Sequence, residues 1–374
     1  MENVKYSKLE YFGVHLMKAI SLFSGAGGMD VGILTAGFSV KIANEIDQVA
    51  CKTYALNHKN TLLIKGDIDQ NLEKFDEISD IDLIFGGPPC QGFSVAGKMD
   101  INDPRSKLVF SFLDVVKRVS PKAFVIENVK SLGSLDKFSH IKNEIISKAK
   151  VMGYEVSLIH LNAKDFGVPQ SRERIFFIGL KNGKSLTLDD FQNYKKDAPS
   201  IREVIAHLGS AGSVNNPHIT NAKITIAKNP VLRKSAYAGM LFNGQGRPLN
   251  PDSWSSTLPA SMGGNRTPII DEDHLYHNKK SWVESYHHSL VNGHDIDNME
   301  VPKTLRRLTI DEAKIIQTFP ENYKFYGTQS KVFTQIGNAV PCRLAEVVGL
   351  VVKKQLETDI TAVLKREIGF LEAV

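Results

Sequence analysis

The sequence predicts an α/β fold, in which a doubly wound, mostly parallel sheet is joined to a second, smaller and irregular domain. Three observations predict it. Short apolar runs alternate with helical segments in the first half of the chain. A glycine-rich turn follows the first of these runs. From about residue 181 the composition becomes rich in Asn, Gly, Ser, Pro and His. The length of 374 residues also exceeds one typical compact core, which favours two domains.

Each predicted strand is a short apolar run followed by turn or acidic residues. The strands are expected at residues 19–23, 40–44, 62–65, 81–85, 123–126 and 174–179. A helix is expected from Met29 to Thr35, ending at Ala36-Gly37, because glycine is a natural C-terminal cap. Strands that alternate with helices in this way indicate a parallel sheet with crossover connections.

Regular structure is expected again near the end of the chain. Thr309 followed by Glu312 matches a capping box and predicts a helix over 309–318. Residues 343–372 are also predicted to be helical. We therefore expect one domain formed by residues 1–180 and completed by 326–374, with a second domain of residues 181–325 between them.

Composition limits the class of protein. Hydrophobic residues make up 42% of the chain and charged residues 23%, as in ordinary globular proteins. No apolar run approaches the roughly 20 residues that span a bilayer, and residues 1–16 have no secretory apolar segment. Three cysteines without a CxxC pair argue against a disulfide framework and a zinc site, so we expect no metal and a reducing, cytoplasmic location. The net charge of +5 permits a nucleic-acid partner without requiring one.

The glycine turn and two acids predict a nucleotide-like ligand. Residues 23–28, Phe-Ser-Gly-Ala-Gly-Gly, join the first strand to a helix, where glycines let a ligand approach the main chain. The spacing is not G-x-G-x-x-G, and a tight packing turn is the alternative. Glu45 ends the second strand and is placed to bind ribose hydroxyls. Asp67 follows the third strand and is placed to accept from an adenine amine. Together they suit an adenosyl ligand without a pyrophosphate.

A thiol, a carboxyl group and two guanidinium groups form the second constellation. Cys90 follows Pro88-Pro89, which stiffen the loop after the fourth strand. Glu127 follows the fifth strand, so both side chains are expected at the same edge of the sheet. Arg172 and Arg174, two residues apart, are expected on one strand face. Such a set can add a thiolate to an electron-poor ring and hold its nitrogen and carbonyl. A small buried cysteine and two solvated arginines are the alternative.

With these residues in place, the chain resembles the DNA cytosine-C5 methyltransferases, in the family's motif order and over nearly its whole length. The motifs that carry the resemblance stand at residues 23–28, 44–47, 66–68, 87–94, 127–129, 170–174, 306–309 with 317–320, and 335–341. The resemblance implies an S-adenosylmethionine-dependent, Rossmann-like catalytic domain. It also implies that residues 181–325 form a target-recognition domain, with the catalytic fold completed after it.

The resemblance implies a cofactor pocket for S-adenosyl-L-methionine and a set of catalytic roles. Glu45 is expected on the ribose and Asp67 on the adenine. The other residues expected to line the pocket are Phe23, Gly25, Gly27, Gly28, Ile46, Ile68, Pro89, Leu108, Asn338 and Val340. Cys90 is expected to attack C6 of cytosine while Glu127 engages N3 and the 4-amino group. Arg174 is expected to contact O2, and Arg172 to orient the pocket or a phosphate.

The resemblance also implies base flipping from double-stranded DNA. The loop after Cys90, with Ser94 and Arg105, is expected to close over the flipped base, although Ala96 stands where some members have a serine. Gln245, between Gly244 and Gly246, is expected to fill the vacated space, with a plain turn as an equal alternative. Thr257 is expected to support the target loop beside the DNA backbone. Scattered cations of the irregular domain are further phosphate-binding candidates: Arg233, Lys234, Arg247, Arg266, Lys279 and Lys280.

Three other functions are alternatives to this one. A tRNA cytosine methyltransferase of the same family is the nearest rival, but its relatives usually carry a shorter variable region. A binding module without catalysis is disfavoured by the intact set of Cys90, Glu127, Arg172 and Arg174. A nicotinamide dehydrogenase fails on the glycine spacing. We expect a monomeric restriction–modification enzyme whose partners are double-stranded DNA and a cognate restriction endonuclease that acts on the same site.

Overall fold

The computed structural model describes residues 16–76, 78–89, 107–181, 183–294 and 299–371. The chain divides into two compact units. The first, called the sheet unit, comprises Met1–Leu161, Glu173–Tyr194 and Leu344–Val374. The second unit comprises Asn162–Arg172 and Lys195–Arg343. Each unit is described by itself below.

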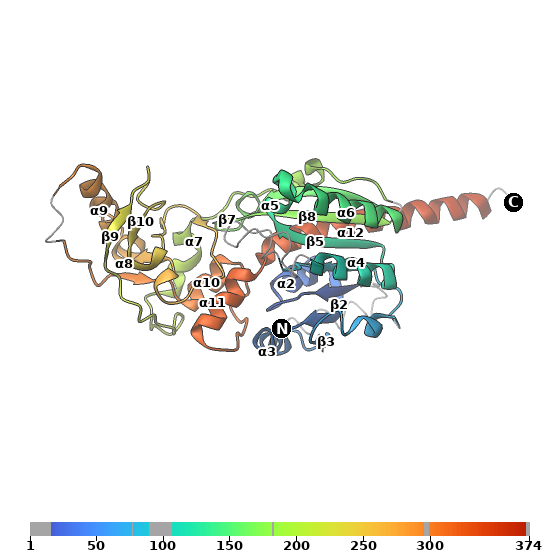
Figure 1. Ribbon diagram of the computed structural model, residues 1–374, viewed down its shortest axis with the longest axis horizontal. Helices are drawn as coiled ribbons and strands as arrows, with labels where there is room; N and C mark the ends of the chain where they lie inside the picture. Colours follow the sequence, from blue (N-terminus) through green and yellow to red (C-terminus); the bar gives the residue numbers. More distant parts are fainter. Residues whose placement is uncertain (1–15, 77, 90–106, 182, 295–298, 372–374) are drawn as a thin grey trace. The chain divides into compact units, whose positions relative to one another are not determined.

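The sheet unit is built on a seven-stranded sheet with the order β3-β2-β1-β4-β5-β8-β6. Figure 1 labels β2, β3, β5 and β8 of this sheet. Its strands are β1 (Met17–Leu22), β2 (Phe38–Glu45), β3 (Leu62–Lys65), β4 (Leu83–Gly86), β5 (Ala123–Val129), β6 (Tyr154–Asn162) and β8 (Glu173–Lys181). The pairs β1–β2, β2–β3, β1–β4 and β4–β5 are parallel, whereas β8 runs antiparallel to β5. The predicted mostly parallel, doubly wound sheet is confirmed.

The strand order reverses direction at β1. From β1 the chain runs outward through β2 to β3, then crosses back to place β4 on the other side of β1. Ligands of open α/β sheets bind at the carboxyl ends of the strands beside such a switch point. A ligand is therefore expected to bind at the carboxyl ends of β1 and β4.

Helices and a continuous apolar core support the sheet. The helices of this unit are α2 (Gly28–Thr35), α3 (Gln48–Asn57), α4 (Leu108–Val119), α5 (Lys130–Ser134), α6 (Ser139–Val151) and most of α12 (Cys342–Leu371). Buried side chains of β1, β4 and β5 pack with those of α4 and α6 in one cluster. The predicted helix after the glycine turn is confirmed as α2, and Gly37 beyond its end has a φ of +94°.

The second unit holds short elements around two smaller clusters of buried residues. Its strands are β7 (Gln170–Ser171), β9 (Ile226–Val231), β10 (Met240–Phe242), β11 (Ser255–Ser256), β12 (Ile269–Asp271) and β13 (Leu305–Arg307). Its helices are α7 (Ile201–Ile205), α8 (Glu272–His277), α9 (Trp282–Val291), α10 (Ile310–Ile316) and α11 (Gln329–Asn338). The predicted capping box of Thr309 and Glu312 is confirmed at the start of α10.

The boundaries of the second unit differ from the predicted 181–325. Val332, Phe333 and Ile336 of α11 pack in one apolar cluster with residues of α7 and α10, so residues 326–343 belong to the second unit. The segment 162–172 joins the same unit, because β7 pairs with β11. These contacts link residues far apart in sequence, which composition does not reveal.

One stretch, Gln329–Thr358, is long and apolar enough to cross a membrane, where the sequence was expected to contain none. It consists of two helices, because α11 ends at Asn338 and α12 begins at Cys342. Within its apolar window, 72% is buried inside the protein. Val347, Val348 and Val352 are completely buried, so the apolar residues of this stretch supply the core.

Candidate active site

The turn after β1 has the backbone of a ligand-binding loop. Phe23 has a φ of +53°, which a non-glycine residue adopts only under strain, and Gly25 and Gly27 have φ values of +55° and +86°. The Ser24 amide donates to the Asn44 carbonyl at 3.0 Å, which ties the turn to β2. A Cβ added to Gly25 would meet no described atom within 4 Å. The turn thus borders open space at the amino end of α2.

Glu45 is bound to this turn. Its Oε2 accepts from the Gly25 amide and its Oε1 from the Asp47 amide, each at 2.7 Å. The side chain is buried, and burial raises the pKa of Glu45. Each carboxylate oxygen keeps a second lone pair, so Glu45 can still accept from two neighbouring hydroxyl groups. Its predicted position at the end of β2 is confirmed, and its contact with a ribose stays a prediction.

The other predicted cofactor residues are divided between the two units. Ile46 is 60% exposed and offers apolar surface beside Glu45, whereas Ile68 is buried in the core of the sheet unit. Asp67 is half-buried after β3, where its Oδ1 accepts from the Asp69 amide at 3.0 Å. Leu108 begins α4 and packs against the core, and Pro89 is half-buried. Asn338 and Val340 lie in the second unit.

Two glycines bring the end of β4 against its neighbours. A Cβ on Gly86 would lie 2.0 Å from the Leu22 carbonyl oxygen, and one on Gly87 would lie 2.9 Å from Glu127 Oε2. The buried Asn128 donates from Nδ2 to the Pro88 carbonyl at 3.4 Å. Glu127 therefore lies beside the main chain that leads directly to Cys90. Cys90, Ser94 and Arg105 themselves lie outside the described residues.

Glu127 is paired with Arg174. Val129 of β5 lies opposite Arg174 in β8, and the Arg174 Nε lies 2.7 Å from Glu127 Oε1. The two side chains are 12% and 14% exposed, so the pair is mostly shielded from water. Attraction between opposite charges is stronger at such a shielded position than in water. The structure brings a carboxylate and a guanidinium group together, as the sequence predicted.

The expectation that Arg172 and Arg174 share one strand face is wrong. The chain pairs with β11 up to Ser171 and with β5 from Arg174, and Arg172 lies between the strands β7 and β8. The Arg172 side chain is buried and donates to main-chain carbonyls of Leu258 and Gly337, at 3.2 and 2.9 Å. A longer contact of 3.5 Å reaches the Asn338 carbonyl. Arg172 thus fixes the end of α11, which carries one of the predicted cofactor residues.

The predicted DNA-contacting residues of the second unit are exposed. The Thr257 hydroxyl donates to the Ser171 carbonyl at 2.8 Å. Gln245 has a φ of +69° and stands between Gly244 and Gly246. A Cβ on Gly244 would lie 2.2 Å from the Asn265 Cβ, and one on Gly246 would lie 2.2 Å from the Thr267 oxygen. The glycines therefore pack against a second loop and leave Gln245 strained on the surface.

Sequence reasoning missed the residues that support these loops. Arg307 is buried and donates to the Thr267 and Asn243 carbonyls at 2.9 Å, on either side of the Gln245 loop. Burial lowers the pKa of Arg307 to about 10. Asn128 supports the Pro88 loop in the same way. Both residues stand within sequence motifs, but the motifs do not indicate which main-chain carbonyl each side chain reaches.

Comparison with known proteins identifies the family. Residues 17–354 match the model of the C-5 cytosine-specific DNA methylases. The chain is 35% identical to the Type II methyltransferase M.FnuDI of Fusobacterium nucleatum, over 91% of this chain and 95% of that one. It is 33% identical to the Type II methyltransferase M.NgoPII of Neisseria gonorrhoeae, over 91% and 96%.

Solved structures have the same fold. A putative DNA modification methyltransferase encoded within a prophage of E. coli matches with a TM-score of 0.65 and 24% identity, over 91% of this chain and 99% of that one. The Dnmt2 methyltransferase of S. pombe matches with a TM-score of 0.62 and 20% identity, over 91% and 99%. The chain belongs to the C-5 cytosine-specific DNA methylase family and is a DNA cytosine-5-methyltransferase.

Proposed function

We propose that the protein transfers a methyl group from S-adenosyl-L-methionine to C5 of a flipped-out cytosine in a specific duplex DNA sequence, through a covalent bond between Cys90 and C6. The observation that carries the proposal is the pairing of Glu127 with Arg174 beside the main chain of Gly87, three residues before Cys90. Family membership supports the reaction itself, methyl transfer to cytosine in DNA.

The residues around the glycine turn fit S-adenosyl-L-methionine. Glu45 retains acceptor capacity at the end of β2, Gly25 borders open space, and Ile46 offers exposed apolar surface for an adenine ring. When bound, the cofactor supplies the methyl group. Asp67 is proposed to accept from the adenine amine, and Asn338 and Val340 are proposed to contact the cofactor as well.

The catalytic residues act on the cytosine ring. The Cys90 sulfur adds to C6, while Glu127 holds N3 and the 4-amino group and Arg174 holds O2. The Arg174 pairing keeps the Glu127 carboxylate oriented toward the main chain of Gly87 before the base arrives. After C5 has been methylated, loss of its proton to water and expulsion of the sulfur restore the aromatic ring.

DNA contacts are assigned to exposed residues. Gln245 is proposed to occupy the space that the flipped base leaves, since its strained backbone holds it outward. Thr257 is proposed to support the target loop through its bond to Ser171. Ser94 and Arg105 are proposed to close over the base, and Arg172 to position the loop that ends α11.

The biological setting is also a proposal. The relatives named above are Type II methyltransferases, which supports a restriction–modification role with a cognate endonuclease that cleaves the same unmethylated site. We propose a cytoplasmic monomer without membrane attachment.

Sequencing of modified cytosines tests the function. The protein is incubated with S-adenosyl-L-methionine and mixed-sequence duplex DNA, and in parallel with total tRNA, before 5-methylcytosine is mapped. We expect methylation at one cytosine of a short recurring DNA sequence and none on tRNA. Methylation only on tRNA, or on neither substrate, would contradict the proposal.

A further inference from the structure

Trp254 is an exposed aromatic residue that the reaction above does not use. It lies just before β11 and is 46% exposed, although large aromatic side chains usually contribute to the core. The Lys164 ammonium lies 5.1 Å from the centroid of its ring, and Asp165 lies 3.1 Å from the same ammonium. An exposed indole with a cation against it is a typical platform for a flat, electron-rich group.

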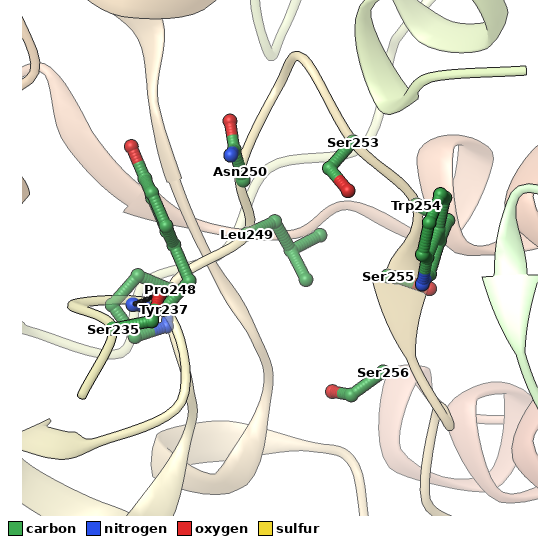
Figure 2. Close-up of a pocket in the computed structure, with 9 residues that line it drawn as sticks. All are labelled: Ser235, Tyr237, Pro248, Leu249, Asn250, Ser253, Trp254, Ser255 and Ser256. Carbon is green, nitrogen blue, oxygen red and sulfur yellow. Dashed lines mark hydrogen bonds between the residues drawn. The ribbon is translucent and has the colours of Figure 1, made fainter. Parts of the chain in front are cut away.

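A polar pocket opens beside this indole. It encloses about 150 Å³ and is lined by Ser235, Tyr237, Pro248, Leu249, Asn250, Ser253, Trp254, Ser255 and Ser256. Figure 2 shows Trp254 at one end of the pocket and Tyr237 with Asn250 at the other, with the side chains of Ser253 and Ser256 between them. Most of the lining groups are hydroxyls or amides, which donate hydrogen bonds without adding charge.

One lining group has an unused hydrogen-bonding capacity. Ser255 is 1% exposed, and its hydroxyl has no hydrogen-bond partner among the described residues. A buried hydroxyl without a partner costs free energy, so such groups usually bind a water molecule or a ligand. Ser255 lines the pocket, so the site includes a residue whose hydroxyl has unused hydrogen-bonding capacity.

The lining residues Ser255 and Ser256 directly precede Thr257, which is predicted to support the target loop. Ser255 and Ser256 form β11 and pair in register with Gln170 and Ser171. The Thr257 hydroxyl also donates to the Ser171 carbonyl. Arg233 and Lys234, both exposed, immediately precede the lining residue Ser235. Hydroxyl groups, an amide and nearby cations are the groups that contact the DNA backbone in proteins.

We infer that Trp254 and this pocket form a contact site for one nucleotide of the DNA substrate, whose base or sugar packs on the indole while its phosphate takes up the serine hydroxyls. The inference rests on the proposed function, because it assigns a new contact to the same DNA. The inference explains why the large side chain of Trp254 is exposed. It also explains why the buried hydroxyl of Ser255 has no hydrogen-bond partner among the described residues.

The tryptophan content offers a direct test. The chain contains two tryptophans, Trp254 and Trp282. Trp282 stacks on Tyr286 at 5.1 Å in an apolar cluster, so Trp282→Phe is a conservative change that leaves Trp254 as the sole indole. Stacking of a base on an indole quenches its fluorescence. We expect the cognate duplex to quench Trp282→Phe and to leave the fluorescence of the reciprocal Trp254→Phe variant almost unchanged.

Affinity measurements complete the test. Trp254→Ala should weaken binding of the duplex by about 5- to 150-fold, with an unchanged KM for S-adenosyl-L-methionine, because loss of one stacked base costs about 1–3 kcal/mol. Trp254→Phe should retain much of the affinity. The control is Tyr326→Ala in the same unit, where the side chain is 45% exposed and should not affect DNA affinity.

The outcomes separate this inference from the proposed function. Suppose that the wild-type protein methylates its DNA site, that the duplex does not quench the fluorescence of Trp254, and that Trp254→Ala binds the duplex as tightly as the wild type. The inference is then overturned and the proposed function stands. If the wild-type protein methylates no DNA cytosine, the proposed function itself fails.

Discussion

Glu127 and its neighbour Asn128 hold three groups together at the end of β5. Glu127 Oε1 lies 2.7 Å from Arg174 Nε, its Oε2 faces the main chain of Gly87, and the next residue, Asn128, bonds to the Pro88 carbonyl. Glu127→Gln keeps the shape but removes the charge and replaces one carboxylate oxygen with an amide group that donates. We expect kcat to fall by about 10²- to 10⁴-fold, the range for loss of a general acid–base group, with S-adenosyl-L-methionine binding unchanged. Single-turnover methylation of a cognate duplex and cofactor titration measure both.

A neighbouring carboxylate provides the matched control. Glu173 is 41% exposed and pairs with Lys130 at 2.9 Å on the surface of the same unit. Glu173→Gln should leave kcat within about twofold of the wild type, because exposed ion pairs contribute at most about 1 kcal/mol. Equal loss of activity in the two variants would show that Glu127 acts through local charge and not at the base.

Gln245 combines strain with exposure. Its φ of +69° costs a non-glycine residue about 1 kcal/mol, which glycine avoids. Gln245→Gly should therefore raise the free energy of unfolding slightly and lower the rate of DNA methylation, since the side chain proposed to enter the duplex is lost. Denaturant unfolding and methylation rates measure the two effects. A more stable variant with full activity would mean that the loop is a plain turn.

Asn278 serves as the control for this strain. It has a φ of +50° as the C-terminal cap of α8, in the same unit. Asn278→Gly should stabilise the protein by a similar amount without any loss of methylation. A parallel loss of activity in this variant would mean that the effect of Gln245→Gly comes from changed loop flexibility.

At the scale of elements, a buried hydrogen bond joins the two helices that follow the glycine turn and Glu45. The Tyr54 hydroxyl in α3 donates to Asp30 Oδ1 in α2 at 2.7 Å, and both side chains are completely buried. The helix α2 begins at the glycine turn, and α3 begins after Glu45. The bond thus fixes the relative positions of the two segments that would hold the cofactor.

This carboxyl group makes stability depend on pH. Burial raises the pKa of Asp30 from 3.8 to about 7, although the Tyr54 hydrogen bond lowers it. Between these values the folded protein binds more protons than the unfolded chain, so its free energy of unfolding falls as the pH rises from about 4 to about 7. The side chain of Asp30→Asn cannot titrate, so the variant should not show the part of this fall in the free energy of unfolding that comes from Asp30. That part amounts to up to about 4 kcal/mol, at 1.4 kcal/mol per pKa unit.

Urea unfolding of both proteins at pH 5 and pH 8 checks this. Relative to the wild type, the free energy of unfolding of Asp30→Asn should be higher at pH 8 than at pH 5. Asp69→Asn, at an exposed position in the same unit, should follow the wild type at both pH values. The prediction fails if Asp30→Asn shows the same pH dependence as the wild type.

At the scale of the whole molecule, the sheet could be predicted because its signals are local. The expected strands at 19–23, 81–85 and 123–126 overlap β1, β4 and β5, and Thr309 caps α10 as the capping box requires. Each of these signals lies within a few neighbouring residues, where hydrophobic pattern and capping chemistry act. The order of the strands, with the antiparallel β8 between β5 and β6, depends on pairings between residues far apart in the chain, which these local signals do not determine.

The site was predictable in part. Glu45, Glu127 and Arg174 follow from their places at strand ends and from family resemblance. The role of Arg172 could not be predicted, because its guanidinium group donates to carbonyls 86 and 165 residues further along the chain. The same holds for Arg307, which binds the loops around Gln245 from 40 and 64 residues away. Such contacts depend on how loops of the folded chain meet, and no local pattern encodes them.

Covalent trapping tests the central claim, that Cys90 attacks a cytosine held by Glu127 and Arg174, most directly. Fluorine at C5 cannot leave as a proton, so a duplex with 5-fluoro-2′-deoxycytidine at the mapped site should keep the sulfur bound to C6. With S-adenosyl-L-methionine, wild type and Cys51→Ser should each form a complex that survives denaturing electrophoresis, whereas Cys90→Ser should form none. A complex that persists in Cys90→Ser would contradict the account.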